Sequence, residues 1–183
     1  MIKKYIRKKV QQVLKAANIK GVGQDVFCRR SFNASEEELP LILVYANQNI
    51  KEPFDSSPKS YKNMYEIVIE VMTAHDSDEE LCDEMDDLEY EVEQAIENDP
   101  ILRGWQPLHK DGQYLEETIA GGTQYDSQGN GSSPMGAVRM NFVSVFIEDP
   151  SNKKAIDDFL GVDIEWNIGD HGTNKAIDKV DII

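Results

Sequence analysis

Two segments of the chain carry apolar residues at helical spacing. In residues 2–17, apolar side chains recur every three or four positions, with lysines on the other side: Ile2, Ile6, Val10, Val13, Leu14 and Ala17. Residues 78–97 have a similar stripe: Leu81, Met85, Leu88, Val92, Ala95 and Ile96. Ser77 and Glu80 form a capping box at the start of the second segment, and Pro100 prevents its continuation. The pattern predicts two amphipathic helices, each with one face in a core.

Other segments alternate apolar and polar residues with the two-residue period of a β-strand. The clearest are residues 61–75, whose apolar face holds Tyr65, Ile67, Ile69 and Val71, and residues 137–149, whose apolar face holds Val138, Met140, Phe142 and Phe146. Shorter strands are expected at residues 25–32, 39–48 and 113–120. The order of helix, three strands, helix and two strands predicts an α+β fold. We expect a mainly antiparallel or mixed sheet of about five strands with both helices packed on one face.

The remaining segments are predicted to be loops and an extension. Residues 49–60 contain two prolines and several turn formers, and residues 101–112 are irregular, with Trp105 and Leu108 as expected anchors. A long Gly/Ser-rich loop is expected over residues 121–136, where the glycines are Gly121, Gly122, Gly129, Gly131 and Gly136. We divide the chain into a domain of residues 1–149 and a C-terminal extension of residues 150–183, which includes a strand-like stretch, VDIEWNI.

Charge is unevenly distributed along the chain. The net charge is −15, which argues against broad nucleic-acid binding, because such binding needs Lys and Arg to replace counterions along the phosphates. Residues 1–30 nevertheless hold nine of the nineteen basic side chains and only one acid, Asp25. A basic end beside an acidic body favours head-to-tail contact between subunits, although a solvated basic helix face is an equal alternative.

Targeting segments and cysteine motifs add little to the functional interpretation. No apolar run approaches the roughly 20 residues of a membrane span, and the lysine-rich start lacks the apolar region of a signal peptide. Cys28 and Cys82 form no metal-binding or redox pair motif. We expect a soluble protein made in the cytoplasm, with no membrane partner.

The acidic stretch from residue 76 to residue 99 is the strongest candidate for chemistry. It holds thirteen carboxylates and neither Lys nor Arg, but the apolar stripe within it favours a structural helix with a solvated acidic face. The candidate metal ligands are His75 with Asp76, Asp78 and Glu79, and His109 with Asp111; neither set has the spacing of a known metal motif. We therefore expect no catalytic residues, no metal and no cofactor, and interpret the protein as non-enzymatic.

The order and character of these elements resemble the tail terminator family, the minor tail proteins of long-tailed bacteriophages. The resemblance covers residues 1–149. It rests on the Leu-Pro-hydrophobic-Val-Tyr strand from Leu39 to Tyr45, the Ile-x-Ile-Glu-Val strand from Ile67 to Val71, the acidic helix around Asp83 to Glu89, and a final aromatic and β-branched strand from Val138 to Ile147. Residues 150–183 extend past the usual end of the family, and the Gly-rich loop is long.

The resemblance implies a virion protein of the tail or neck that assembles as a homohexameric ring on the tail tube. Such a ring ends tube growth and offers a surface to the head–tail connector, while DNA passes through its lumen without specific binding. The implied partners are other copies of the chain, the tail tube protein and the connector protein. The contact residues that we expect are Lys3, Arg7, Lys8, Arg29, Arg30, Gly121, Gly122, Gly129 and Gly131.

Three alternatives stay open at this stage. The first is another neck component, such as a tail completion or head–tail joining protein, which would also self-assemble through sheet edges. The second is a small metal-dependent hydrolase that uses the carboxylates near His75. The third is an acidic decoy that mimics DNA, whose binding to a basic partner should collapse with salt.

Overall fold

The structure is a computed structural model that describes residues 2–28, 35–57, 59–108, 114–128 and 134–148. The predicted extension, residues 150–183, lies outside this part of the chain. Along the described residues the elements are α1 (Ile2–Ala17), β1 (Val26–Cys28), a short 3-10 helix (Glu36–Glu38), β2 (Leu41–Ser56), β3 (Lys59–Ala74), α2 (Asp78–Glu97), β4 (Glu117–Gln128) and β5 (Met135–Glu148).

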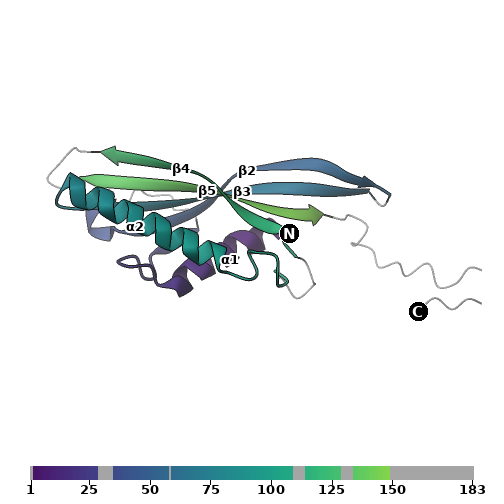
Figure 1. Ribbon diagram of the computed structural model, residues 1–183, viewed down its shortest axis with the longest axis horizontal. Helices are drawn as coiled ribbons and strands as arrows, with labels where there is room; N and C mark the ends of the chain where they lie inside the picture. Colours follow the sequence, from purple (N-terminus) through teal and green to yellow (C-terminus); the bar gives the residue numbers. More distant parts are fainter. Residues whose placement is uncertain (1, 29–34, 58, 109–113, 129–133, 149–183) are drawn as a thin grey trace, which may run out of the picture.

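The five strands form one mixed sheet in the order β1-β2-β3-β5-β4. β1 pairs with β2 in parallel, and the other three pairs are antiparallel. Both helices lie on the same side of this sheet (Figure 1). The predicted α+β class, with about five strands and two helices on one face, is therefore confirmed.

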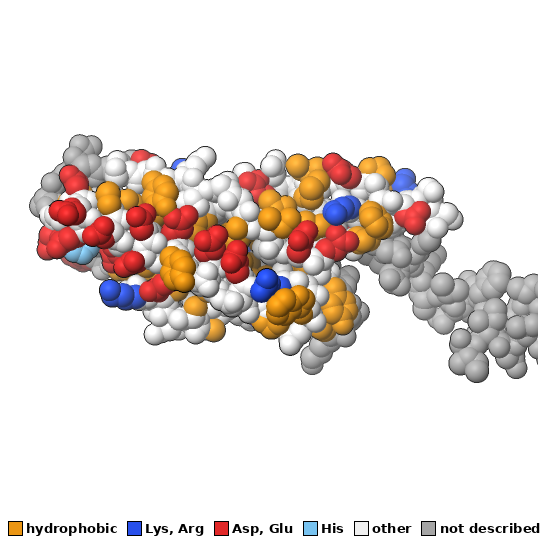
Figure 2. Space-filling view, in the orientation of Figure 1, with side chains coloured by type: hydrophobic (Ala, Val, Ile, Leu, Met, Phe, Trp, Pro, Cys, Tyr) orange, Lys and Arg blue, Asp and Glu red, His pale blue; other side chains and the backbone are white. Residues whose placement is uncertain are grey.

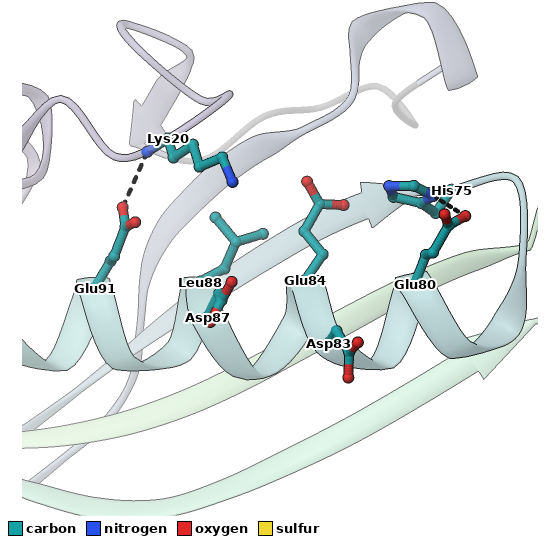
Figure 3. A pocket seen from close by; sticks show the side chains of 8 residues that line it. All are labelled: Lys20, His75, Glu80, Asp83, Glu84, Asp87, Leu88 and Glu91. Atoms are coloured by element: carbon teal, nitrogen blue, oxygen red, sulfur yellow. Dashed lines mark hydrogen bonds and ion pairs between the residues drawn. The ribbon is translucent and has the colours of Figure 1, made fainter.

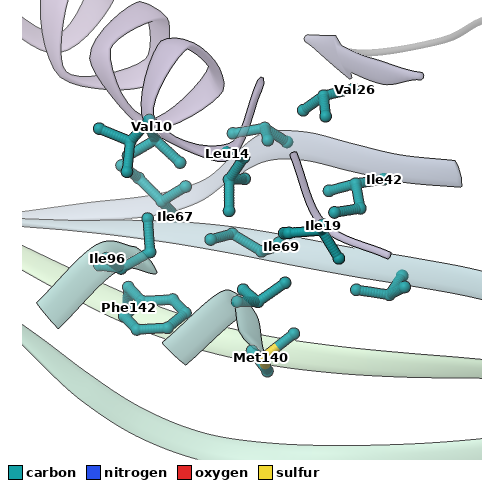
Figure 4. Packing of buried hydrophobic residues seen from close by; sticks show 14 of the residues in the cluster. Val10, Leu14, Ile19, Val26, Ile42, Ile67, Ile69, Ile96, Met140 and Phe142 are labelled. Carbon is teal, nitrogen blue, oxygen red and sulfur yellow. The ribbon is translucent and has the colours of Figure 1, made fainter. Parts of the chain in front are cut away.

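The core lies between this face of the sheet and the two helices (Figure 4). The predicted helical stripes supply its helix layer: the buried residues are Ile6, Val10, Val13 and Leu14 of α1 and Leu81, Met85, Leu88, Val92 and Ile96 of α2. The sheet contributes its alternate residues, including Ile67, Ile69, Met140 and Phe142. Because each helix has only one apolar face, burial of that face fixes its rotation and turns its polar side to solvent.

The predicted cap sets where α2 begins. The Ser77 Oγ accepts a hydrogen bond from the Glu80 amide at 3.3 Å and donates one to the Glu80 carboxylate at 2.9 Å. Asp78, Glu79 and Glu80 occupy the first turn, where the positive end of the helix dipole favours them. The helix ends at Glu97, with Asn98 as its C-cap, so both predicted boundaries are confirmed.

The loop predicted over residues 49–60 is wrong. Residues 49–56 continue β2, and β3 already begins at Lys59, so the two strands form a long hairpin. Within it Ile50 pairs with Met64 and Pro53 pairs with Tyr61, and register shifts accommodate the polar and proline-containing segment. Backbone pairing with β3 is what keeps this polar sequence extended.

The loop predicted over residues 121–136 is also wrong in part. Residues 121–128 belong to β4, which pairs with β5, and residues 134–136 include the start of β5. Gly121 and Gly122 lie at a register shift between Ala120 and Thr123, where a bulge interrupts the ladder. The strand predicted at residues 113–120 is thus the first part of a longer one.

The anchors predicted between α2 and β4 are corrected in one respect. Trp105 is 68% exposed, so it does not anchor this segment in the core. Leu108 does pack against the core, and the fully buried residues here are Leu102 and Leu115. Among the described residues, no helix is long and apolar enough to cross a membrane.

Candidate functional site

A groove of about 240 Å³ runs along α2 from Glu80 to Glu91 (Figure 3). The strand end before α2 contributes His75, and the segment after α1 contributes Lys20 on the opposite wall. The lining residues are Lys20, His75, Glu80, Asp83, Glu84, Asp87, Leu88 and Glu91. The groove therefore contains the acidic stretch and one of the two histidines considered as metal ligands.

Contacts within the protein already engage four of the lining side chains: His75, Glu80, Glu84 and Glu91. The His75 Nδ1 lies 3.0 Å from the Glu80 Oε2 and also accepts a hydrogen bond from the Asp76 amide at 3.0 Å. The Glu84 carboxylate accepts a hydrogen bond from the Thr73 hydroxyl at 2.6 Å, and the Glu91 carboxylate accepts one from the Lys20 amide at 2.9 Å. These carboxylates hold α2 against the end of β3 and the segment after α1.

The groove does not bring together the residues that were considered as candidate metal ligands. Among residues 2–28, 35–57, 59–108, 114–128 and 134–148, no group of three His, Cys, Asp or Glu side chains is placed to hold a metal ion. Asp76, Asp78 and Glu79 are exposed near the start of α2, while His75 turns toward Glu80. His109 and Asp111, the other candidate pair, lie outside the described residues.

The outer face of α2 is a continuous acidic surface. Eleven of its twenty residues are Asp or Glu, and none is Lys or Arg. Figure 2 shows these carboxylates as a row along the helix. Only some contact groups of the same chain: Glu89, for example, accepts a short hydrogen bond from the Tyr125 hydroxyl of β4. This contact raises the pKa of Tyr125 to about 12, because the hydrogen bond holds the phenol proton and the nearby carboxylates oppose phenolate formation.

The basic residues predicted on α1 have different surroundings. Lys3 lies over the Tyr65 ring, with its Nζ 5.7 Å from the ring centroid. Arg7 is half-buried beside β1 and β3, whereas Lys8 is exposed. Of the three, Lys8 is thus the most accessible to another molecule, and Arg7 is engaged within its own chain.

Arg7 also affects the pKa values of two neighbouring groups, the Cys28 thiol and the Tyr65 phenol. Burial raises the pKa of the Cys28 thiol and of the Tyr65 phenol, and the positive charge of Arg7 opposes both shifts. The Cys28 Sγ also donates a hydrogen bond to the Gln11 side-chain oxygen at 3.3 Å. A half-buried thiol with a raised pKa is a weak nucleophile, so this cysteine is a packing residue of the α1–β1 contact.

The other predicted contact residues are partly outside the described chain. Arg29, Arg30, Gly129 and Gly131 fall in segments that the structure does not describe. Gly121 and Gly122 belong to β4 and are both exposed. The structure therefore brings these glycines to the sheet edge and does not place them in a loop.

The second face of the sheet carries no helix in the described part of the chain, as the prediction of both helices on one face implies. Alternate strand residues point away from the core cluster and form this helix-free face. Near its centre, the Arg139 guanidinium donates to the Glu70 carboxylate at 2.7 Å, and the Tyr45 hydroxyl donates to the same carboxylate at 3.1 Å. Glu70 is 9% exposed, and its contact raises the pKa of Arg139. The opposite charges of Glu70 and Arg139 are visible in the sequence, but the pairing of β3 with β5 that brings them together is not.

Two sheet edges are also without a neighbouring strand in the described part of the chain. β1 forms one edge, with three residues, and β4 forms the other, with twelve. β4 carries two exposed large apolar side chains: Ile119 on the helix-free face and Tyr125 on the helix side. An edge strand of this length is a template for pairing with another chain.

Comparison with known proteins does not assign the chain to a family. Neither the models of known protein families nor the curated protein sequences match it.

Proposed function

We propose that this protein is a non-enzymatic virion assembly protein that forms a ring, with six copies as the expected number, on the end of a phage tail tube. The ring ends tube growth and provides the interface to the head connector. The observation that carries the proposal is the β4 edge, twelve residues long, which has no partner strand among the described residues. The order of elements in the subunit is also that of the resemblance to tail terminators.

Ring closure requires two different surfaces on each subunit that fit one another. A cyclic assembly of more than two copies uses such head-to-tail contacts, since a self-complementary patch gives only a dimer. The β4 edge offers one surface. The basic side of α1, which includes Lys8, and the acidic face of α2 offer a charged pair that favours one orientation of neighbouring subunits.

The negative charge of α2 is also compatible with a ring whose lumen DNA passes through. Eleven carboxylates along one helix repel phosphates, and a surface of this sign lets DNA move without binding to it. The proposed role therefore needs no nucleic-acid site. It also needs no catalytic group, because the work of a terminator is to occupy the tube end.

The mass of the free protein tests self-assembly. We expect light scattering on a sizing column to give a species of six subunits that persists at high salt, because apolar strand contacts are not screened. Ile119→Glu on the β4 edge should shift the mass toward the monomer, whereas Phe54→Glu at an exposed position of the β2–β3 hairpin should not. A protein that remains monomeric at every concentration, and stays so when tail tubes are added, would contradict the proposal.

A second set of variants tests the charged contact between neighbouring subunits. Charge reversal at Lys8 should weaken assembly, while the same reversal at the fully exposed Lys59 of the β2–β3 hairpin should leave it unchanged. Binding of the ring to heads or to tubes separates the terminator from another neck component. A ring that binds isolated heads but not tail tubes would favour a head-side joining protein.

A further inference from the structure

The helix-free face of the sheet carries an apolar patch at the end of the molecule where β5 finishes. We define this patch as Ile50, Met64, Val143, Val145 and Ile147. Ile50 pairs with Met64 across β2 and β3, and Met64 pairs with Val145 across β3 and β5, so these three form one row. Val143 and Ile147 flank Val145 two residues away on the same face of β5, since alternate strand residues share a face.

Two side chains of the patch are exposed in the described part of the chain, and Met64 and Val143 are half-buried. Ile50 is 45% exposed in the middle of β2, and Ile147 is 39% exposed near the end of β5. Val145 is buried, yet it does not belong to the core cluster beneath the helices. The patch is thus a second apolar surface, separate from the core and on the opposite side of the sheet.

The chain continues directly from this patch. β5 ends at Glu148, one residue after Ile147, and thirty-five further residues follow. Within them Val162, Ile164, Trp166 and Ile168 alternate with polar residues, which is the pattern of a segment with one apolar side. Packing of this side against another apolar surface is favourable, because it removes the apolar area of four side chains from water.

The linker between the end of β5 and the apolar segment of residues 162–168 is short. Thirteen residues separate Glu148 from Val162, enough to span about 45 Å when extended and ample to turn back onto the end of β5. A tether of this kind holds the segment near the patch at an effective concentration on the order of millimolar. A free partner would have to exceed that concentration or bind more tightly.

From this placement we propose that the segment of residues 162–168 docks on the apolar patch of its own chain and covers the helix-free face at that end. Val162, Ile164, Trp166 and Ile168 supply the apolar side, and Ile50 and Ile147 receive it. The interaction does not depend on ring formation. The C-terminal extension is then a cover for the second face of the sheet.

Tryptophan fluorescence of the full chain tests the docking. Trp105→Phe removes the exposed tryptophan and leaves Trp166 as the only reporter. We expect blue-shifted emission and weak quenching by acrylamide. Ile147→Glu in this background should shift the emission to the red and raise the quenching constant several-fold. Tyr90→Glu, at an exposed side chain of α2 on the helix side of the sheet, should change neither quantity.

A cross-link tests whether the segment comes from the same chain, and it remains informative if Ile147→Glu does not fold. With Cys28 and Cys82 replaced by serine, Ile50→Cys and Ile164→Cys should form a disulfide within one chain under mild oxidation. Denaturing, non-reducing electrophoresis then gives a monomer of altered mobility. Dimers as the main product, no cross-link, or a fully quenchable Trp166 in the parent protein would each overturn the proposal.

Discussion

Replacing Gly104 with alanine should destabilise the protein strongly, because the new methyl group would meet backbone atoms. Gly104 has φ +77°, and a Cβ built there lies 2.4 Å from the Leu115 carbonyl oxygen and 2.5 Å from that of Glu116. The left-handed conformation alone costs an L-residue roughly 1–2 kcal/mol. Overpacking adds about 1–3 kcal/mol, so we expect a loss of about 2–5 kcal/mol in the free energy of unfolding.

Gly23 provides a matched control that separates these two effects. Its φ is +56°, but no heavy atom lies within 4 Å of the position of a Cβ. Gly23→Ala should therefore cost only the conformational part, about 1–2 kcal/mol. Urea unfolding followed by far-ultraviolet circular dichroism measures both variants against the parent. The slopes should agree if only stability has changed.

The comparison tests how the segment after α2 is held against the start of β4. Gly104 contacts the residues that lead into that edge strand, so the clash reports on the placement of β4. Equal losses for the two variants would mean that the backbone contact at Leu115 and Glu116 does not exist. Parent-like stability of Gly104→Ala would refute both the contact and the left-handed conformation.

Three further predictions concern caps and polar contacts. Ser77→Ala should lower the free energy of unfolding by about 1 kcal/mol, measured by urea unfolding, because α2 loses its N-cap, while Ser77→Asp should retain most of the stability. Arg139→Ala should lower the free energy of unfolding by about 1–3 kcal/mol in the same assay, because it removes a hydrogen-bond donor from the nearly buried Glu70 carboxylate. Adding Glu70→Gln should recover part of the loss. Additive losses in the double variant would contradict the pairing. The Tyr125 pKa of about 12 stands above the ordinary value of 10.0, so its contact with Glu89 stabilises the fold fully below pH 10 and this contribution is lost as pH rises toward 12. Ultraviolet titration should show that Tyr125→Phe removes a late-titrating phenol, and an unchanged titration curve would argue against the hydrogen bond.

The helices and two of the strands could be predicted because their apolar residues face a single core. The stripes of α1 and α2 and the alternation in β3 and β5 are burial patterns, and the buried residues follow them closely. The start of α2 was equally readable, since the Ser77 cap is a local interaction between residues close in sequence. Local contacts and one-sided burial leave a direct trace in a single sequence.

The second half of β2 and most of β4 could not be predicted for a different reason. Their residues are polar, small or proline, and they stay extended because their backbones pair with β3 and β5. Such pairing depends on partners distant in sequence and not on side-chain hydropathy. The same limit explains the error at Trp105, since its size suggested an anchor while the smaller Leu102 and Leu115 fill the core.

The candidate site divides in the same way. The acidic face of α2 follows from helical geometry and could be predicted in full. The pairing of Glu70 with Arg139, the half-buried position of Arg7 and the place of Gly121 at a sheet edge all depend on which strands are neighbours. That information appears only once the sheet order is known.

Electron microscopy of tail tubes assembled with this protein tests the central proposal most directly. In the proposed role the chain acts on a phage tail tube protein, which would be polymerised with and without the purified chain, and tube ends and lengths would be compared. We predict a ring at one end of each tube and an end to growth at that end. Tubes that continue to lengthen with bare ends, at protein concentrations well above that of tube ends, would contradict the account.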